Sequence, residues 1–310
     1  MLEPQSCYLC GSDDSTHFID ANEDLTGKPG TFHFVTCDQC GLRYQNPRVD
    51  MKHIQDFYDD EYIAHRKKSN WGPLGPIYEW AMNKHDRDKA KLVRRYVDLK
   101  PETRVLDVGC AVGSFLTHVG QTHGCQLSGV DFKDLTHFPG MEKIRFHLGL
   151  FYEQDIPDRS FDLITMWHFL EHDYDPIRSL KTARDKLSED GRLVIEVPRL
   201  DSVSFKLYKE RWPGLQAPQH TVLFDKKHLL QFLDKADLEL VEYLPWGAFP
   251  AYFYLFTGAA FKVLKGKGLN LDKWIYPYFA GQLMLSPVLL AEKHLNLAMQ
   301  TVVCKRKACA

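Results

Sequence analysis

Residues 105–116 read VLDVGCAVGSFL, and this stretch decides the fold. The apolar, β-branched residues 104–108 predict a buried parallel strand. Gly109 and Gly113 then predict a tight turn, and residues 114–121 predict the start of a helix. A strand, a glycine turn and a helix N-terminus place bare backbone amides beside a ligand in α/β sheets. The spacing matches neither the Gly-x-Gly-x-x-Gly dinucleotide pattern nor a P-loop.

A second apolar stretch, QLSGVDF at residues 126–132, ends in Asp131. An acidic residue at the end of a second strand can accept hydrogen bonds from both ribose hydroxyls of a nucleoside. The ring of Phe132, the next residue, can cover the adenine. Taken singly, the glycine turn fits any α/β crossover and Asp131 fits a helix cap. Their order and spacing together favour a nucleoside-containing cofactor.

The two stretches VLDVGCAVG and GVDF resemble the first two motifs of the class I S-adenosylmethionine-dependent methyltransferases. Later segments follow the order of that family. The fourth strand is expected within 161–172, the fifth within 188–198, a helix and the sixth within 225–245, and an antiparallel seventh within 298–307. The resemblance covers roughly residues 101–245 and the last ten. It implies an α/β fold with a seven-stranded, Rossmann-like sheet.

The resemblance also implies S-adenosylmethionine as the cofactor. We expect the glycine turn to line its methionine and ribose, Asp131 to hold the ribose hydroxyls, and Phe132 and Phe151 to lie near the adenine. The full set of predicted cofactor residues is Asp107, Gly109, Cys110, Ala111, Gly113, Asp131, Phe132, Phe151 and Trp167.

Two Cys-x-x-Cys-Gly knuckles place four cysteines near the N-terminus: Cys7, Cys10, Cys37 and Cys40. Two cysteines three apart on a tight turn can direct both sulfurs at one ion, and the glycine that follows allows a positive φ. Four such ligands predict a closed structural site, with zinc favoured over a rubredoxin-like iron. A disulfide pair and free thiols remain alternatives. The stretch 32–37 is strand-like, so we expect residues 1–48 to form a zinc ribbon.

The remaining chain divides into a helical connector or lid, 49–100, and the methyltransferase domain, 101–310. About fifty residues, 246–297, separate the sixth and seventh strands, where this fold has a short connection. They contain two uncharged stretches, 246–261 and 274–291, each slightly short for a spanning helix. One reading of this insertion is a buried helical cap over the active site. The other is a segment that contacts a membrane surface.

A zinc ribbon ahead of this domain resembles the zinc-ribbon sugar C-methyltransferases and related enzymes of surface-glycan and natural-product pathways. Those enzymes carry an Asp-Glu-His segment, which PQHTVLFD matches here, with His220 at the histidine. The resemblance implies His220 as the general base, His172 as a second active-site histidine and Tyr62 as a lid tyrosine. His168 follows the fourth strand, close to where the methyl group is expected. Histidine suits proton removal near neutral pH, although each of these rings is also open to a structural role.

Gln219 stands where the sugar family has a glutamate, so an O-methyltransferase is as compatible as a C-methyltransferase. A hydrophobic or lipid-linked acceptor is a second reading, and a non-catalytic zinc-ribbon interaction protein is a third. The formal net charge of −2 shows no excess of basic residues for binding the phosphates of a nucleic acid. Methylation of the amino groups of nucleic-acid bases would suggest an Asn-Pro-Pro-Tyr or Asp-Pro-Pro-Tyr motif after the fourth strand, and this sequence has neither there.

The composition and the first residues of the chain indicate the class of protein and its expected location. The chain has 310 residues, of which 44% are hydrophobic and 26% are charged, which is typical of a globular protein with a sizeable core. The first residues, MLEPQSCYLC, lack the charged and apolar regions of a secretory signal, so we expect a cytoplasmic protein. The prediction is a methyltransferase of a small molecule such as a sugar or a glycan intermediate, with membrane association as the alternative. No feature predicts the oligomeric state.

Overall fold

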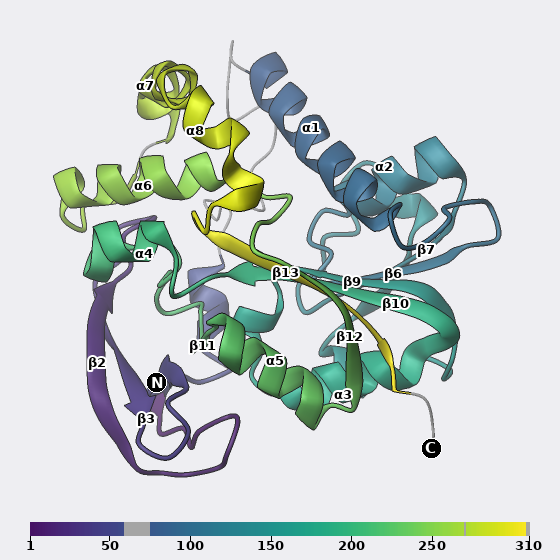
Figure 1. Ribbon diagram of the computed structural model, residues 1–310, viewed down its shortest axis with the longest axis horizontal. Coiled ribbons are helices and arrows are strands. Elements are labelled where there is room, and N and C mark those ends of the chain that lie inside the picture. Colours follow the sequence, from purple (N-terminus) through teal and green to yellow (C-terminus); the bar gives the residue numbers. More distant parts are fainter. Residues whose placement is uncertain (59–74, 270, 308–310) are drawn as a thin grey trace.

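The computed structural model describes residues 1–58, 75–269 and 271–307 (Figure 1). Within them, the chain forms a seven-stranded sheet, a four-stranded sheet and a two-stranded sheet. The seven-stranded sheet has the order β12-β13-β10-β9-β6-β7-β8. It consists of β6 (Arg104–Val108), β7 (Gln126–Asp131), β8 (Arg145–Leu148), β9 (Phe161–Trp167), β10 (Leu187–Pro198), β12 (Leu238–Leu244) and β13 (Met299–Arg306). The predicted α/β class and seven-stranded sheet are confirmed.

The strand directions also follow the prediction. The pairs β6–β7, β6–β9, β7–β8 and β9–β10 are parallel, whereas β13 is antiparallel to both β10 and β12. The central strands are apolar because both faces of the sheet are covered. Val105, Leu106 and Val108 of β6 are all completely buried.

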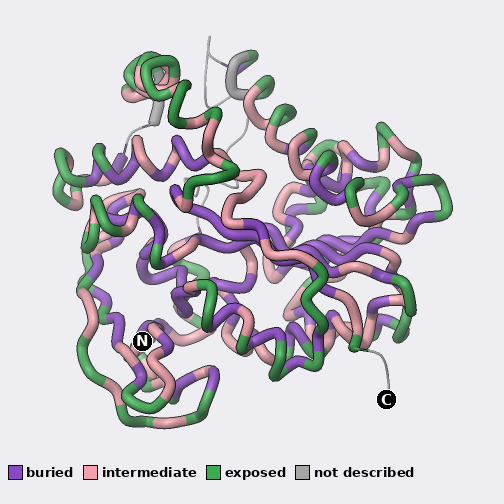
Figure 2. The backbone as a smooth tube through the Cα atoms, viewed as in Figure 1, coloured by how far each residue is buried: buried purple, intermediate pink, exposed green. Residues whose placement is uncertain are grey.

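Two pairs of helices cover the sheet (Figure 1). α1 (Gly75–Val93) and α2 (Ser114–His123) lie on one face, and α3 (Pro176–Lys186) and α5 (Lys226–Lys235) lie on the other. Asp175 and Asp225 begin α3 and α5 as caps, because each carboxylate accepts a hydrogen bond from a backbone amide three residues on. The buried part of the chain runs along the central strands (Figure 2).

Residues 246–297 form the predicted helical insertion. It contains α6 (Ala251–Leu264), α7 (Leu271–Met284), α8 (Ser286–Leu290) and a short 3-10 turn at Glu292–His294. Its start is fixed to the sheet, since the buried Glu196 of β10 accepts hydrogen bonds from the amides of Ala248 and Phe249. Among the described residues, none of the helices is long and apolar enough to cross a membrane.

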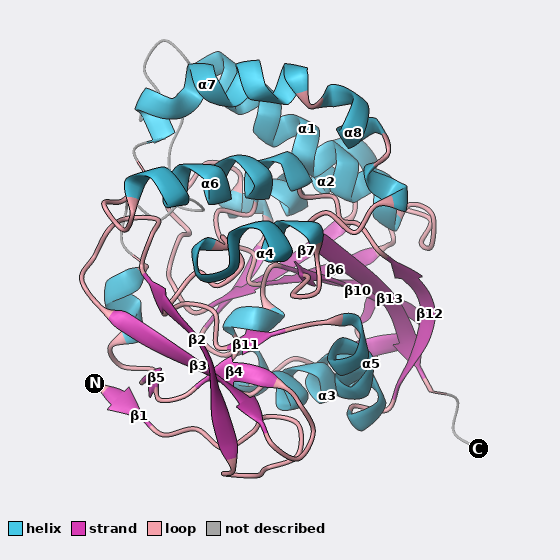
Figure 3. Cartoon of the chain, turned by 60° about the vertical axis from the view of Figure 1, so that its left-hand side comes forward, coloured by secondary structure: helices cyan, strands magenta, loops and turns pink. Residues whose placement is uncertain are grey.

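The N-terminal segment contributes three strands of the four-stranded sheet, whose order is β11-β4-β3-β2 (Figure 3). β2 (Ser15–Asn22), β3 (Thr31–Cys37) and β4 (Arg43–Gln45) come from the N-terminal segment, and β1 (Leu2–Glu3) pairs separately with β5 (Arg48–Val49). The fourth strand, β11 (Val222–Leu223), lies almost two hundred residues further along and pairs with β4. The ribbon is therefore continuous with the methyltransferase half, and a boundary at residue 48 stays a prediction.

Candidate active site

A cavity of about 890 Å³ opens at the carboxyl ends of β6, β7 and β9, where ligands bind in α/β sheets. It is lined by the predicted residues Asp107, Gly109, Cys110, Ala111, Asp131, Phe132, Phe151, Trp167, His168, His172 and His220. Gly113 does not line this cavity; it precedes α2 and packs against Met141 and Ile144. Tyr62 lies outside the described residues, so its lid role stays a prediction.

The glycine turn needs its glycines for a reason other than close ligand approach. Gly109 has φ 74° and Gly113 has φ 67°, a region that favours glycine. A Cβ at Gly109 would lie 2.8 Å from the ring of Phe169, and one at Gly113 would lie 2.5 Å from the Met141 sulfur. The backbone amides at the start of this turn are not free to bind a ligand either. Those of Gly109 and Cys110 donate to the carbonyl of Val130.

Asp131 joins the turn to the end of β7. One carboxylate oxygen accepts a hydrogen bond from the amide of Ala111 at 2.9 Å, and the other accepts from the amide of Lys133 at 3.0 Å. Burial raises the pKa of this carboxyl, although these amides oppose the rise. Asp131 also lines the cavity, where a carboxylate can accept further hydrogen bonds. The residues therefore fit the ribose hydroxyls of S-adenosylmethionine, as the sequence predicts.

Helix α1 contributes two residues that the sequence analysis missed. Asp86 and Lys89 line the cavity, and the Lys89 ammonium lies 5.3 Å from the centre of the Trp167 ring. Close by, Asp107 accepts a 2.6 Å hydrogen bond from Thr165, and burial raises the pKa of Asp107 to about 7. Both residues lie within the stretch 49–100, whose pattern predicts a helical connector but assigns no role to its individual polar residues.

His172 and His220 form a pair on the opposite wall, with ring centres 4.4 Å apart. Nδ1 of His172 donates to the carbonyl of Gln219 at 3.1 Å, and Nδ1 of His220 donates to the carbonyl of Gly214 at 2.8 Å. A carbonyl can only accept, so each Nδ1 carries the proton and each Nε2 is bare. Burial lowers the pKa of both histidines, His172 most strongly. Both rings are therefore neutral near pH 7.

Tyr58 completes this wall and was not predicted. Its hydroxyl lies 2.8 Å from Nδ1 of His172, and its ring centre lies 5.1 Å from that of Phe132. It belongs to the same aromatic, acidic stretch that contains Tyr62. Residues 57 and 58 are held to the site, because Lys133 donates to the carbonyl of Tyr58 and Gln219 donates to that of Phe57.

His168 lies between two buried carboxylates. Its Nδ1 is 3.4 Å from Glu171, and its Nε2 is 3.2 Å from Glu196. Burial opposes charge on this ring, yet the two carboxylates raise the pKa of His168 to about 9. A ring that already holds its second proton cannot accept one from a substrate. The geometry therefore favours His220 and His172 over His168 as a base, and His168 as a positioning residue.

The remaining wall of the cavity is aromatic. The insertion supplies Phe249, Phe253, Tyr254, Phe256, Trp274, Tyr278 and Phe279, and the sheet side adds Phe115 and Trp167. The inner faces of α6 and α7 thus cap the cavity, as one reading of the sequence expects. Such a lining suits an apolar ligand portion.

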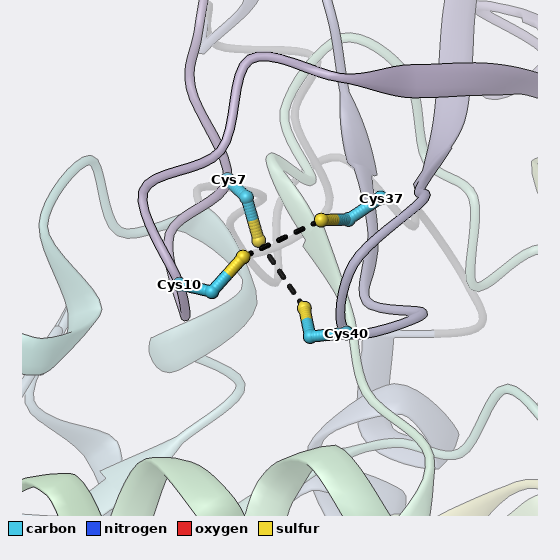
Figure 4. A group of neighbouring side chains, drawn as sticks. All are labelled: Cys7, Cys10, Cys37 and Cys40. Atoms are coloured by element: carbon cyan, nitrogen blue, oxygen red, sulfur yellow. Dashed lines mark hydrogen bonds between the residues drawn. The ribbon is translucent and has the colours of Figure 1, made fainter.

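The four N-terminal cysteines converge at a separate site (Figure 4). Their sulfurs lie within 4.8 Å of one another, with Cys7–Cys40 and Cys10–Cys37 each at 3.5 Å. Sulfurs bound to one tetrahedral zinc would be about 3.8 Å apart, given a Zn–S bond of about 2.3 Å. Gly11 and Gly41 after the knuckles have positive φ, as predicted. The donor set fits a structural zinc.

Comparison with known proteins identifies the family. Residues 82–243, more than half of the chain, match a family profile described as a methyltransferase domain. The chain belongs to this methyltransferase family. The prediction of a methyltransferase domain is therefore confirmed, and the family supports S-adenosylmethionine as its cofactor.

Individual relatives are more distant. The tRNA U34 carboxymethyltransferase of Aeromonas salmonicida is 36% identical over 108 residues, which are 31% of this chain and 32% of that protein. The uncharacterized methyltransferase YcgJ of Bacillus subtilis is 27% identical over 136 residues, 40% of this chain and 54% of that one. The chain thus spans about a third to a half of the length of these relatives. Their names do not confirm the narrower resemblance to sugar C-methyltransferases.

A solved structure shares the fold. The phosphoethanolamine N-methyltransferase 2 of Haemonchus contortus, in complex with S-adenosyl-L-methionine, superposes with a TM-score of 0.52 at 16% identity. The match covers 86% of this chain and 62% of that chain. At this identity the likeness shows the fold alone.

We predict that Asp131→Ala weakens binding of S-adenosylmethionine about 10- to 100-fold. The substitution removes the carboxylate that we expect to accept hydrogen bonds from the two ribose hydroxyls of the cofactor. Asp131→Asn, which keeps the size of the side chain, should lie between this variant and the wild type. Isothermal titration calorimetry measures the affinity, and thermal melting checks that both variants fold. Unchanged affinity in a folded Asp131→Ala variant would remove Asp131 from the cofactor site.

Proposed function

We propose that the chain transfers a methyl group from S-adenosylmethionine to a hydrophobic small molecule, at an atom that loses a proton. The observation that carries this proposal is the bare Nε2 of His172 and His220 in the cavity that also holds the glycine turn and Asp131. The cofactor supplies, when bound, a methyl group on a sulfonium. The chain has to orient the acceptor, exclude water and take up the proton.

His220 is the residue best placed to take up the proton. It is 2% exposed, and its hydrogen bond to the carbonyl of Gly214 fixes the ring. Proton uptake makes the ring positive, and the nearby carboxylate of Glu171 favours that charge. His172 packs edge-on against His220 and is itself held by Gln219 and Tyr58. The pair thus offers an oriented, neutral base in a site shielded from solvent.

The aromatic wall supports a hydrophobic acceptor more than a bare sugar. Rings from α6 and α7 line the acceptor side, and polar groups there are few. A glycan or natural-product intermediate with an apolar portion fits this lining. One relative acts on tRNA according to its name. The net charge of −2 still opposes a nucleic-acid acceptor, and its exclusion stays a prediction.

We predict that His220→Ala lowers kcat about 100-fold while the affinity for S-adenosylmethionine changes less than about twofold. The reason is that His220 acts on the acceptor proton and lies apart from Asp131. His123→Ala, at the end of α2, serves as a control with unchanged kcat. Methyl transfer to the acceptor under saturating cofactor measures kcat. Full activity of a folded His220→Ala variant would exclude His220 as the base.

The outer face of the insertion supports contact with a membrane surface. Large apolar side chains there are exposed: Tyr276, Leu283, Met284, Val288 and Leu290. Of the two helices that carry these side chains, α7 also lines the cavity, with Trp274, Tyr278 and Phe279, so an acceptor in a lipid layer would lie near the aromatic wall. Lys262, in the last turn of α6, and Lys265 and Lys267, just after it, are exposed. Apolar side chains beside lysines suit an anionic lipid surface.

We expect the chain to float with phosphatidylglycerol vesicles, and Leu283→Ser with Leu290→Ser to reduce the bound fraction several-fold. Leu148→Ser, which changes an exposed leucine on the edge strand β8, is the control and should bind as the wild type does. Equal flotation of all three proteins would contradict a role for α7 and α8.

We also propose zinc as the ion of the four-cysteine site. Metal analysis of the purified chain by mass spectrometry is expected to find one zinc per chain. Cys37→Ser should lose it, whereas Cys125→Ser, outside the cluster, should keep it. Iron instead of zinc as the ion that Cys37→Ser loses, or the same zinc content in Cys37→Ser as in the wild type, would contradict the assignment.

A further inference from the structure

We propose that Glu171, His172 and His220 form a divalent metal site on the wall of the cavity. The ligand atoms of these side chains lie within 4.8 Å of one another. The centre of three atoms so spaced is at most about 2.8 Å from each, and metal–nitrogen and metal–oxygen bonds are about 2.0–2.2 Å long. Movements of less than about 1 Å would bring all three atoms onto one ion.

Glu171 is the residue that points to a cation. It is 1% exposed, and neither oxygen of its carboxylate has a hydrogen-bond partner among the described residues. Its ion-pair partner is His168, which approaches only one of the two oxygens, at 3.4 Å, and also faces Glu196. One histidine ring cannot neutralise two buried carboxylates. A buried charge without full compensation is costly, and a bound cation would remove that cost.

Both histidines are already oriented as metal ligands. A ligating histidine commonly donates its other ring N–H to a backbone carbonyl, which fixes the tautomer and the ring. His172 does so to Gln219, and His220 does so to Gly214. Two imidazole nitrogens and one carboxylate form the donor set of divalent Mn, Fe, Co and Zn sites that keep open positions. His172 and His220 border the cavity, so those positions would face it.

The open positions would take an oxygen of the acceptor, from a hydroxyl, an enol or a phenol. Its O–H bond would break, the proton would pass to water, and the oxygen would bind the ion as an anion. In the metal-free site Nε2 of His220 takes up the proton itself; with the ion bound, this nitrogen is a ligand and the ion promotes loss of the proton in its place. This statement about the acceptor rests on the proposed function. The proposal that a cation binds to Glu171, His172 and His220 does not rest on the proposed function.

The test is a manganese(II) titration of the full chain that carries one zinc, on the four thiolates, with free manganese counted by electron paramagnetic resonance. Manganese is the weakest binder of the divalent series, so it leaves zinc on the four thiolates. We expect one manganese per chain. Glu171→Gln and His220→Gln should each raise the dissociation constant at least about tenfold.

Asp20→Asn is the matched control, because His17, Asp20 and His33 form another cluster with ligand spacing among the described residues, on the exposed ribbon surface. It should bind manganese as the wild type does. Manganese should also raise the melting temperature of the wild type and of Asp20→Asn, but not that of a folded Glu171→Gln. No binding to the wild type, equal binding to Glu171→Gln, or a loss confined to Asp20→Asn would overturn the proposal. Calorimetry with S-adenosylmethionine in manganese-free buffer tests the proposed function separately.

Discussion

Thr221 makes the two backbone hydrogen bonds on which the candidate active site depends. Its carbonyl accepts from the amide of Gln45 at 2.9 Å, and its amide donates to the carbonyl of Glu171 at 2.8 Å. The first bond begins the pairing of β11 with β4 of the ribbon, and the second fixes the segment after β9. His220 therefore lies between the ribbon and the methyltransferase sheet. Neither half alone determines the position of this histidine.

This arrangement gives the four-cysteine site a role in the geometry of the active site. The knuckle Cys37–Cys40 precedes β4 by only a few residues, and His228 of α5 donates from Nε2 to the carbonyl of Cys40 at 3.1 Å. An ion that closes the knuckle thus fixes β4, and β4 fixes the segment before β11. A structural ion bound there would stabilise the geometry of the candidate active site without touching the substrate.

The local patterns in the sequence predicted much of the fold, and most of the predicted cofactor residues line the cavity. The apolar strand before Gly109 and the acidic end of the second strand are signals within a few residues of one another, and both elements form as expected. The groups around the histidines were not predictable in this way. Tyr58 meets His172 across 114 residues of chain, and Glu196 meets His168 from the next strand. Gly113 is the opposite case. The sequence analysis assigns it to the cofactor site, but its positive φ and its packing against Met141 account for the glycine without a ligand.

The central claim is methyl transfer to a hydrophobic small molecule, and a labelling experiment tests it most directly. The chain is incubated with methyl-labelled S-adenosylmethionine and a cell extract, which is then separated into lipid-extractable, water-soluble, RNA and protein fractions. The account predicts label in the lipid-extractable fraction, because α6 and α7 line the cavity with aromatic rings and α7 and α8 also expose large apolar side chains. Label confined to RNA or to protein would contradict it.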